Sequence, residues 1–460
     1  MLKKISKLLA LLLIVVFLVS CSGGANVTEN ADAEEVSEPE EEAEVEEEAE
    51  EAEEVEVVDI TWRTRPGGEG EQDTYQKVSD ALDAEMENVN LSYDPAPYEG
   101  YEDKLLTELS SGTAPDIIWV PGATFSSYAE KGVFVDLAPL IEADPDINAE
   151  DFYSVVMDEI THDGMIYGLP RDVGTMAVYY NVDMFEAAGL QTPKELQEEG
   201  NWNWDTMYEL ALAMTTNTES AEDVTWGLSI PFWWPTFLNF IGQAGGSLFN
   251  EDRTACGLNS DATIEALEFL NKVYNGDEEN GPVAPAPGTE GDAANMFLTG
   301  KIAMHFDGRW TTPTVRKMGT MNWDVAELPE GSAGKHNFAF WGAYAITTST
   351  DDVDAAFEVL KALVSAETQN AIIELGTIQP SIVAEAATEA FLASTPPENN
   401  QAFINGLEYA IPEQSPWNIN MNTLLWAVLH PEVNRVFVGE ITPEEFAESI
   451  CEQIDPLFED

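Results

Sequence analysis

Pro115-Asp116-Ile117-Ile118-Trp119-Val120 is the stretch that decides the fold of this chain. A turn-forming Pro-Asp pair is followed by four large apolar residues in succession, with no polar residue between them. Such an unbroken run is typical of a strand that is buried on both faces, as in a parallel sheet covered by helices. The hexapeptide therefore predicts a buried strand inside an α/β sheet.

The sequence on the N-terminal side of this stretch alternates between two patterns. Residues 57–64 and 90–93 have the alternation and β-rich composition of strands, whereas 75–87 and 101–109 carry apolar residues at helical spacing. This order of strand and helix is typical of an α/β fold.

The same alternation continues toward the C-terminus. Residues 164–170 and 177–181 predict strands. Asp205 is expected to cap a helix that ends at Met214, and Thr350 is expected to cap another helix. No internal repeat of fixed period is found, and about 400 residues of this kind are expected to form two domains or lobes.

The N-terminus has the features of a secretory signal. Lys3, Lys4 and Lys7 precede an apolar run from residue 8 to residue 19, which is shorter than the roughly 20 residues of a membrane-spanning helix. Leu18-Val19-Ser20-Cys21 is similar to the lipobox of bacterial lipoproteins, in which the signal (here 1–20) is removed and the cysteine is lipidated. The alternative is a signal anchor with an incidental cysteine.

A strongly acidic segment follows Cys21. It has 18 Asp and Glu between residues 29 and 59 and no Lys or Arg. It cannot bury enough apolar surface to fold, so residues 21–57 are expected to be a lipidated, disordered tether. The protein is then expected outside the cytoplasm, anchored to the outer face of the cell membrane.

Composition excludes several classes of function. The chain has 86 acidic against 19 basic residues, so no basic face is available to bind nucleic acid. Solubility is the simplest reason for the excess of acid. No Cys/His cluster is present, so neither a metal site nor a cofactor is expected. Cys256 and Cys451 lie outside the reducing cytosol and form either a disulfide or two buried thiols.

Several ordered motifs together resemble the extracellular solute-binding proteins of sugar ABC importers, the maltose-binding-protein-like group. The resemblance covers nearly all of residues 58–450, and the order and spacing of the motifs make it specific. The motifs are Ala114-Pro115-Asp116-Ile117-Ile118, Tyr128-Ala129-Glu130-Lys131-Gly132, Tyr167-Gly168-Leu169-Pro170, Tyr179-Tyr180-Asn181, Phe185-Glu186-Ala187-Ala188-Gly189-Leu190, Gly300-Lys301-Ile302-Ala303-Met304, Gly308-Arg309-Trp310, Trp341-Gly342 and Ser365-Ala366-Glu367-Thr368-Gln369.

The resemblance implies an α/β, two-lobed periplasmic-binding-protein fold, in which each lobe is a mostly parallel sheet flanked by helices. Lobe one would hold 58–172 with 340–378, and lobe two 173–339 with 379–460. A carbohydrate would bind in the cleft between the lobes, which close about a hinge. The implied partners are the transmembrane subunits of an ABC importer, and a monomer is expected.

Candidate ligand contacts begin with tryptophans, since aromatic rings stack on the CH-lined faces of sugars and polar groups bind the hydroxyls. Trp233 or Trp234 in the turn-rich Pro231-Phe232-Trp233-Trp234-Pro235 segment, together with Trp310, Trp417 and Trp341, are candidates, with ordinary core packing as the alternative. Five other tryptophans are assigned to the core: Trp62, Trp204, Trp226, Trp323 and Trp426.

The first polar candidate, Asp172, follows Pro170-Arg171 at an expected crossing between the lobes. Asp172 either faces the ligand or pairs with Arg171, and Arg309 either binds ligand or forms a salt bridge. Further candidates, from loops that rim the cleft in the family, are Arg65, Tyr98 and Glu99. The loop Pro121-Gly122-Ala123-Thr124 lacks the acid and arginine of the maltose-binding pattern, which places maltose itself in doubt.

Two other functions compete with sugar capture and delivery. A cell-surface glycoside hydrolase needs two suitably spaced carboxylates, and an acidic chain offers many pairs. A binding protein for a glycerol-phosphate compound or a peptide would share the fold. No nucleophile elbow, metal motif or phosphate loop is present, so no enzyme activity is expected.

Overall fold

A computed structural model of the chain describes residues 57–458, apart from 67–70, 97–99, 217–223, 289–294, 318, 320, 375, 413–415 and 418–420. The predicted signal segment, Cys21 and the tether up to residue 56 therefore lie outside the described residues, as do Tyr98 and Glu99.

The first of two main sheets has seven strands in the order β12-β6-β11-β3-β1-β2, with β13 paired to β11. The pairs β1–β2, β1–β3 and β11–β13 are parallel, whereas β11 is antiparallel to β3 and β6, and β12 is antiparallel to β6. The strands are β1 (Val58–Arg63), β2 (Val89–Tyr93), β3 (Ile117–Pro121), β6 (Leu169–Gly174), β11 (Asn337–Ile346), β12 (Gln379–Pro380) and β13 (Ala410–Pro412).

The predicted buried strand at residues 115–120 forms β3, inside this sheet. Ile117, Ile118 and Val120 are completely buried, as predicted for a strand covered on both faces. The flanking helices are α1 (Glu71–Glu85), α2 (Tyr101–Ser111), α3 (Gly122–Ala129), α4 (Ala138–Ala143), α5 (Ser154–Ile160), α13 (Val353–Leu363), α14 (Ala366–Ile373) and α15 (Glu385–Ala393). A short β4 (Thr161–His162) and β5 (Met165–Ile166) pair with each other.

The second sheet has four strands in the order β10-β7-β9-β8. They are β7 (Met176–Asn181), β8 (Trp226–Ser229), β9 (Ile302–Gly308) and β10 (Trp323–Ala326). Helices around it are α6 (Val182–Ala188), α7 (Pro193–Glu198), α8 (Trp204–Met214), α9 (Trp234–Gln243), α10 (Asp261–Asn275), α12 (Thr312–Lys317), α16 (Gln401–Glu408), α17 (His430–Phe437) and α18 (Pro443–Ile454), with a π-helix at Thr423–Leu429. Short 3₁₀ turns lie at Ala149–Asp151, Arg309–Thr311 and Asp455–Phe458.

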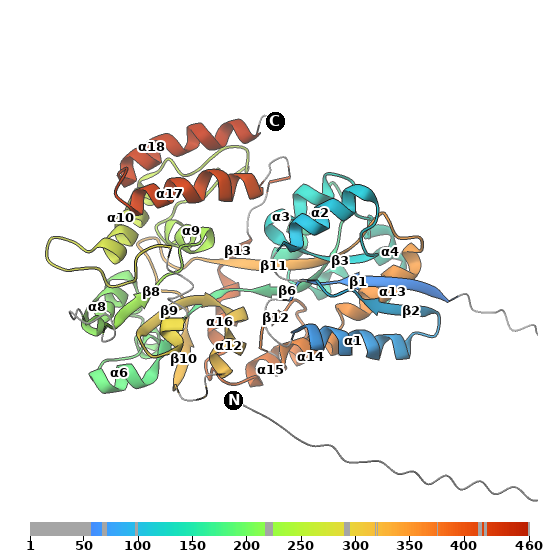
Figure 1. The fold of residues 1–460 in the computed structure, drawn as a ribbon, viewed down its shortest axis with the longest axis horizontal. Coiled ribbons are helices and arrows are strands. Elements are labelled where there is room, and N and C mark those ends of the chain that lie inside the picture. Colours follow the sequence, from blue (N-terminus) through green and yellow to red (C-terminus); the bar gives the residue numbers. More distant parts are fainter. Residues whose placement is uncertain are drawn as a thin grey trace, which may run out of the picture. The chain divides into compact units, whose positions relative to one another are not determined.

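Two sheets with helices around them confirm the predicted α/β, two-lobed architecture (Figure 1). The sheets are mixed, however, rather than mostly parallel. In the second sheet β7 runs antiparallel to both β9 and β10, and only β8–β9 is parallel. The reason is topological: β6 and β11 run antiparallel as they cross the middle of the molecule, and β7 continues directly from β6.

The crossing between the sheets is fixed by hydrogen bonds. The backbone N–H of Thr175, between β6 and β7, donates to Oε1 of Gln379 at 2.8 Å, and its hydroxyl donates to the carbonyl of Phe403 at 2.9 Å. Along β11, Phe340 packs in an apolar core on one face of the second sheet, and Trp341 in another core that covers the first sheet and reaches the opposite face of the second. The two cores therefore meet where these strands cross.

Two predicted helix caps are wrong by two residues. Asn203 caps α8, because its Oδ1 accepts the N–H of Thr206 at 3.1 Å, and Asp205 lies within the first turn. Asp352 caps α13 by accepting the N–H of Ala355 at 2.9 Å, so Thr350 precedes the cap. In both helices the residue with extended backbone next to the first turn takes the cap position.

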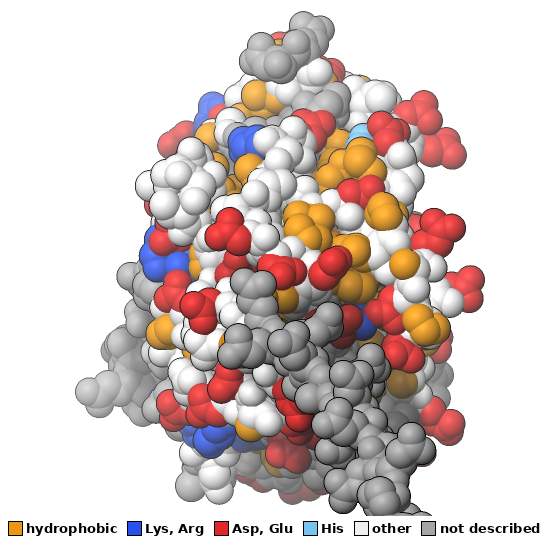
Figure 2. Space-filling view, turned by 90° about the vertical axis from the view of Figure 1, so that its right-hand side faces the viewer, with side chains coloured by type: hydrophobic (Ala, Val, Ile, Leu, Met, Phe, Trp, Pro, Cys, Tyr) orange, Lys and Arg blue, Asp and Glu red, His pale blue; other side chains and the backbone are white. Residues whose placement is uncertain are grey.

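Cys256 and Cys451 are joined in a disulfide, with 5.3 Å between their Cα atoms, which ties α18 to the loop after α9. In the part of the chain that the structure covers, no helix has the length and apolar character needed to cross a bilayer. The face shown in Figure 2 carries many more acidic than basic side chains, in line with the composition.

Candidate functional site

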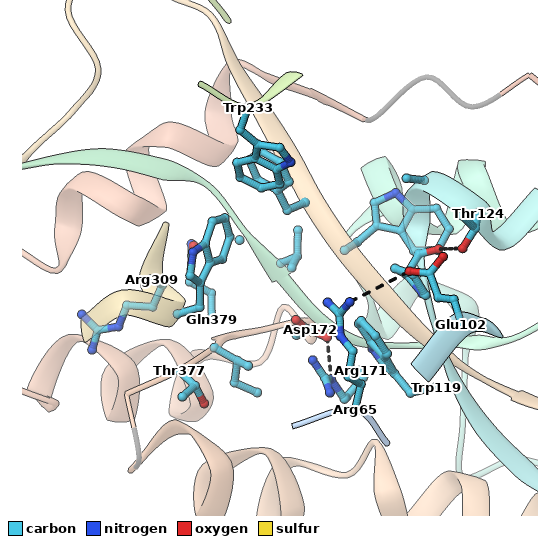
Figure 3. Close-up of a pocket in the computed structure, with 18 of the residues that line it drawn as sticks. Arg65, Glu102, Trp119, Thr124, Arg171, Asp172, Trp233, Arg309, Thr377 and Gln379 are labelled. Carbon is cyan, nitrogen blue, oxygen red and sulfur yellow. Dashed lines mark hydrogen bonds and ion pairs between the residues drawn. The ribbon is translucent and has the colours of Figure 1, made fainter. Parts of the chain in front are cut away.

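A cavity of about 400 Å³ lies where the two sheets meet. Its size falls within the roughly 300–1,000 Å³ of small-molecule sites. Strands β3, β6 and β11 of the first sheet and helix α9 beside the second sheet all contribute to its walls (Figure 3).

One wall of the cavity is aromatic. Trp233, at the N-cap of α9, stacks on Phe340 with ring centroids 5.5 Å apart and planes at 20°. Trp310 meets both rings edge-on, at 5.9 Å from Trp233 and 5.4 Å from Phe340. Trp234 lies behind them, with 3% of its surface exposed. This wall offers wide, flat apolar surfaces of the kind that stack on sugar rings.

The other side of the cavity is built around Trp119 on β3. The guanidinium carbons of Arg171 and Arg65 lie 4.5 Å and 4.8 Å from the centroid of its ring, within cation–π distance. Both arginines approach Trp119 in Figure 3. An aromatic residue thus holds two cationic groups at the edge of the cavity.

Arg171 is anchored by further bonds. Its Nε donates to Oδ1 of Asp172 at 2.6 Å, and its Nη1 donates to the hydroxyl of Thr64 at 2.7 Å. Burial, the largest single influence, lowers the pKa of Arg171, but Asp172, Tyr75 and Tyr344 together raise it, and the net pKa lies above its ordinary value. The guanidinium therefore stays charged.

Carboxylates accompany each arginine. Oε1 of Glu102, in the first turn of α2, lies 4.0 Å from Nη1 of Arg65. Burial raises the pKa of Glu102, and the charge of Arg65 opposes that shift. Glu71 also lines the cavity and accepts the hydroxyl of Tyr75 at 3.3 Å. Two arginines and three carboxylates therefore stand at this end of the cavity.

Three residues that line the cavity carry a buried polar atom without a hydrogen-bond partner among the described residues: Nε1 of Trp119, Nε1 of Trp341 and the hydroxyl of Thr377. An indole N–H can only donate. All three atoms are buried, so they are not themselves exposed to the cavity.

Seven of the ten residues that the sequence predicted as ligand contacts line this cavity. They are Trp233, Trp234, Trp310, Trp341, Asp172, Arg309 and Arg65. Their contact with a ligand stays a prediction. Tyr98 and Glu99 fall outside the described residues.

Trp417 lies away from the cavity lining and stacks on His162, with centroids 4.3 Å apart. Arg309 lines the cavity, but its guanidinium turns away from it, over the ring of Phe391 at 4.8 Å, and donates to Asn400 (Figure 3). Burial lowers the pKa of Arg309 to about 9. The guanidinium of Arg309 therefore contacts Phe391 and Asn400 rather than the cavity.

Sequence reasoning placed Trp426 in the core, and this was wrong. Its side chain is 48% exposed and lines the cavity from the π-helix. Trp62, Trp204 and Trp323 are buried as predicted. Sequence reasoning also missed Trp119 and Glu102 as lining residues. The only signal for Glu102 was its place next to Tyr98 and Glu99 in a loop expected at the cleft.

Comparison with known proteins identifies the class to which this fold and cavity belong. The sequence profile of the bacterial extracellular solute-binding proteins matches residues 66–370, about two thirds of the chain, and the chain belongs to that family. An ABC substrate-binding protein of Listeria monocytogenes, solved in complex with cycloalternan, has a TM-score of 0.77 and 25% identity over 87% of this chain and 99% of its own. The two-lobed periplasmic-binding-protein fold is thereby confirmed.

Individual relatives are distant. The lactose-binding protein of Rhizobium radiobacter is 26% identical over 359 residues, 74% of this chain and 75% of its own. A maltooligosaccharide ABC transporter solute-binding lipoprotein of Streptococcus pneumoniae is 24% identical over 318 residues, 66% of this chain and 69% of its own. The chain spans 63% of the length of the first curated relatives it matches. The family is one of extracellular binding proteins rather than enzymes.

Proposed function

We propose that this protein captures an uncharged oligosaccharide in the cavity between its two lobes and delivers it to the transmembrane subunits of an ABC importer. The observation that carries the proposal is the division of the cavity into an aromatic wall around Trp233 and Trp310 and a polar end around Trp119. Stacking surfaces and fixed hydrogen-bonding groups are the two requirements of a sugar site.

The electrostatics of the cavity favour a neutral sugar. Arg171 is bound to Asp172, Arg65 lies beside Glu102, and Glu71 adds a third carboxylate, so this end carries no excess of positive charge. An anionic ligand that displaced Asp172 from Arg171 would leave a largely buried charge without its partner, which is costly. An uncharged sugar, by contrast, can bind beside these groups without breaking either pair.

The lobes are proposed to follow the boundaries expected from the sequence, 58–172 with 340–378 and 173–339 with 379–460, except that β12 (Gln379–Pro380) and α15 (Glu385–Ala393) lie with the first sheet. Contacts from both lobes would let the ligand favour a closed arrangement, because binding shifts the balance between two states only through a difference in affinity for them. A monomer suffices for this function, since one chain supplies both walls of the cavity.

A lipid on Cys21 is proposed to anchor the protein to the outer face of the cell membrane. Support comes from the Leu18-Val19-Ser20-Cys21 sequence and from the extracellular family to which the chain belongs. The acidic stretch of residues 21–57 would then be a leash that spans roughly 35 Å as a random coil. Mass spectrometry of the protein purified from membranes tests this: an unmodified N-terminus would contradict it.

A thermal-shift titration tests sugar capture. Maltotriose and lactose are compared with glycerol 3-phosphate and a tripeptide, and the sugar is recovered afterwards. Only a ligand that binds the folded state raises the melting temperature, and the rise grows with its concentration. The proposal expects a rise with a sugar that is recovered intact. A rise with only the phosphate or the peptide, or cleavage of the sugar at enzyme-like rates, would contradict it.

A further inference from the structure

Two tryptophan rings at the cavity lie directly over glycines. A Cβ atom added at Gly308 would stand 2.1 Å from Cη2 of Trp310 and 2.3 Å from its Cζ2 and Cζ3. A Cβ added at Gly342 would stand 2.0 Å from Nε1 of Trp119 and 2.4 Å from its Cε2. Real Cβ atoms essentially never approach other heavy atoms within 3.0 Å. Neither ring could keep its place over any other residue.

These glycines are not required by backbone conformation. Gly308 has φ −89° and ψ 177°, an extended conformation that every residue adopts. Gly342 lies within β11, and its φ is not among the positive values found in the described residues. Any L-residue could adopt these backbone conformations. Glycine is needed at each position because an indole ring occupies the space that a Cβ atom would take.

The two rings belong to opposite sides of the cavity. Trp310 forms part of the aromatic wall, where it meets Trp233 and Phe340 edge-on. Trp119 forms the polar end and holds the guanidinium groups of two arginines against its face. The rings line the cavity, and the glycines lie beneath them.

The surroundings of Trp119 show which way it would move. It is 4% exposed, its backbone pairs with β11, and Tyr101 packs at 6.1 Å from its ring. The cavity is the open side. A methyl group at position 342 would therefore push the indole into the space that a ligand needs and would move Arg65 and Arg171 with it.

We propose that Gly308 and Gly342 are positioning residues of the binding site: each provides the space in which one tryptophan, Trp310 or Trp119, lies flat and faces the cavity. The part of this inference that concerns ligand rests on the proposed function, whereas the coupling between each glycine and its tryptophan does not. Two experiments separate these parts.

The first experiment needs no ligand. Melting temperatures are measured for G342A, W119A and the double variant W119A/G342A. If the alanine acts by displacing the ring, the loss caused by G342A falls by at least half in the W119A background, because coupled sites are not additive. The same pattern is expected for G308A and W310A. An equal loss in both backgrounds would overturn the inference.

A matched control is available in Gly246, which lies away from the cavity and is crowded by Ile241 at 2.7 Å and Ala262 at 3.2 Å instead of by a tryptophan. G246A should cost the same in the natural and W119A backgrounds. If G342A alone does not fold, recovery of a cooperative transition in W119A/G342A supports the inference, and a double variant that also fails to fold overturns it.

The second experiment measures affinity for maltotriose or lactose, whichever binds the natural chain. Folded G308A and G342A should each bind on the order of tenfold more weakly, as expected when a central aromatic contact is displaced, and G246A should keep its affinity. Natural affinity in G308A and G342A would overturn the positioning role even if the coupling is found. If the natural chain binds no sugar at all, the proposed function fails. The ligand-free experiment still decides whether each glycine is coupled to its tryptophan.

Discussion

Arg171 should be one of the most sensitive positions in the protein, because it is a buried cation on the strand that crosses between the lobes. Only 6% of the residue is exposed. It donates to Asp172 at 2.6 Å and to Thr64 at 2.7 Å, and it lies 4.5 Å from the ring of Trp119. Arg171→Met keeps the apolar stem and removes every one of these polar contacts.

The size of the effect follows from what is left behind. Removing one partner of a buried ion pair costs about 3–5 kcal/mol, since the other charge stays buried without compensation. The Asp172 side chain is 20% exposed, so water recovers part of this cost. We expect R171M to lower the free energy of unfolding by about 3 kcal/mol, measured by equilibrium urea unfolding followed by tryptophan fluorescence at pH 7.

Two companion variants make the test specific. D172N in the R171M background removes the stranded carboxylate and should restore a large part of the lost stability. Arg435→Met removes an arginine whose side chain is 43% exposed and pairs with Glu432, so its cost should stay below about 1 kcal/mol. A loss in R171M no larger than that in R435M, or no recovery with D172N, would refute the reasoning.

Three further predictions concern other parts of the molecule. Trp310→Ala should weaken binding of the sugar by tenfold or more, whereas Trp417→Ala should leave the affinity within about threefold, because Trp310 lines the cavity and Trp417 does not. Calorimetric titration compares the two variants, and equal losses of affinity would contradict the site. The loop closed by Cys256 and Cys451 spans 195 residues, so replacing both by Ser should lower the stability by about 2–5 kcal/mol in urea, and unchanged stability would show that the bond does not form. Burial lowers the pKa of His336 from 6.5 to about 4. Below pH 6.5 the unfolded chain therefore binds a proton that the folded chain does not, and the stability should fall as the pH decreases from about 6.5 to about 4. His336→Gln should reduce that fall relative to the natural chain, and an identical pH profile would exclude the effect.

The fold could be predicted from local sequence because its signals are local. An unbroken apolar run such as Ile117-Ile118-Trp119-Val120 needs burial on both faces, and a strand covered by helices on both sides provides it. Strand direction could not be predicted in the same way. Whether β11 runs parallel or antiparallel to β3 depends on connections of more than 200 residues, which leave no trace in either strand.

The site was only partly predictable, because lining a cavity depends on contacts between distant segments. Trp233 and Trp310 were found through motifs of the family and through turn-rich sequence around Trp233. Trp426 was assigned to the core because it stands in an apolar run, Leu424-Leu425-Trp426-Ala427-Val428, yet the π-helix turns it toward the cavity. A helix of that kind changes which residues share a face, and sequence spacing does not reveal it.

The pairing of Cys256 with Cys451 was left open for the same reason. Proximity of residues so far apart in sequence is a property of the packed chain, in which α18 returns to the loop after α9. The choice between ligand contact and ion pair for Asp172 is also set by tertiary structure. Its carboxylate binds Arg171 and lines the cavity as well, so the two alternatives are compatible.

Isothermal titration calorimetry of the purified chain with maltotriose and lactose tests the central claim most directly. Capture of an uncharged sugar between an aromatic wall and a polar end predicts saturable binding of one sugar per chain, lost in the W233A/W310A variant while the fold is retained. If no uncharged sugar binds, or if binding is unchanged when both tryptophans are removed, the account of this cavity as a sugar site is contradicted.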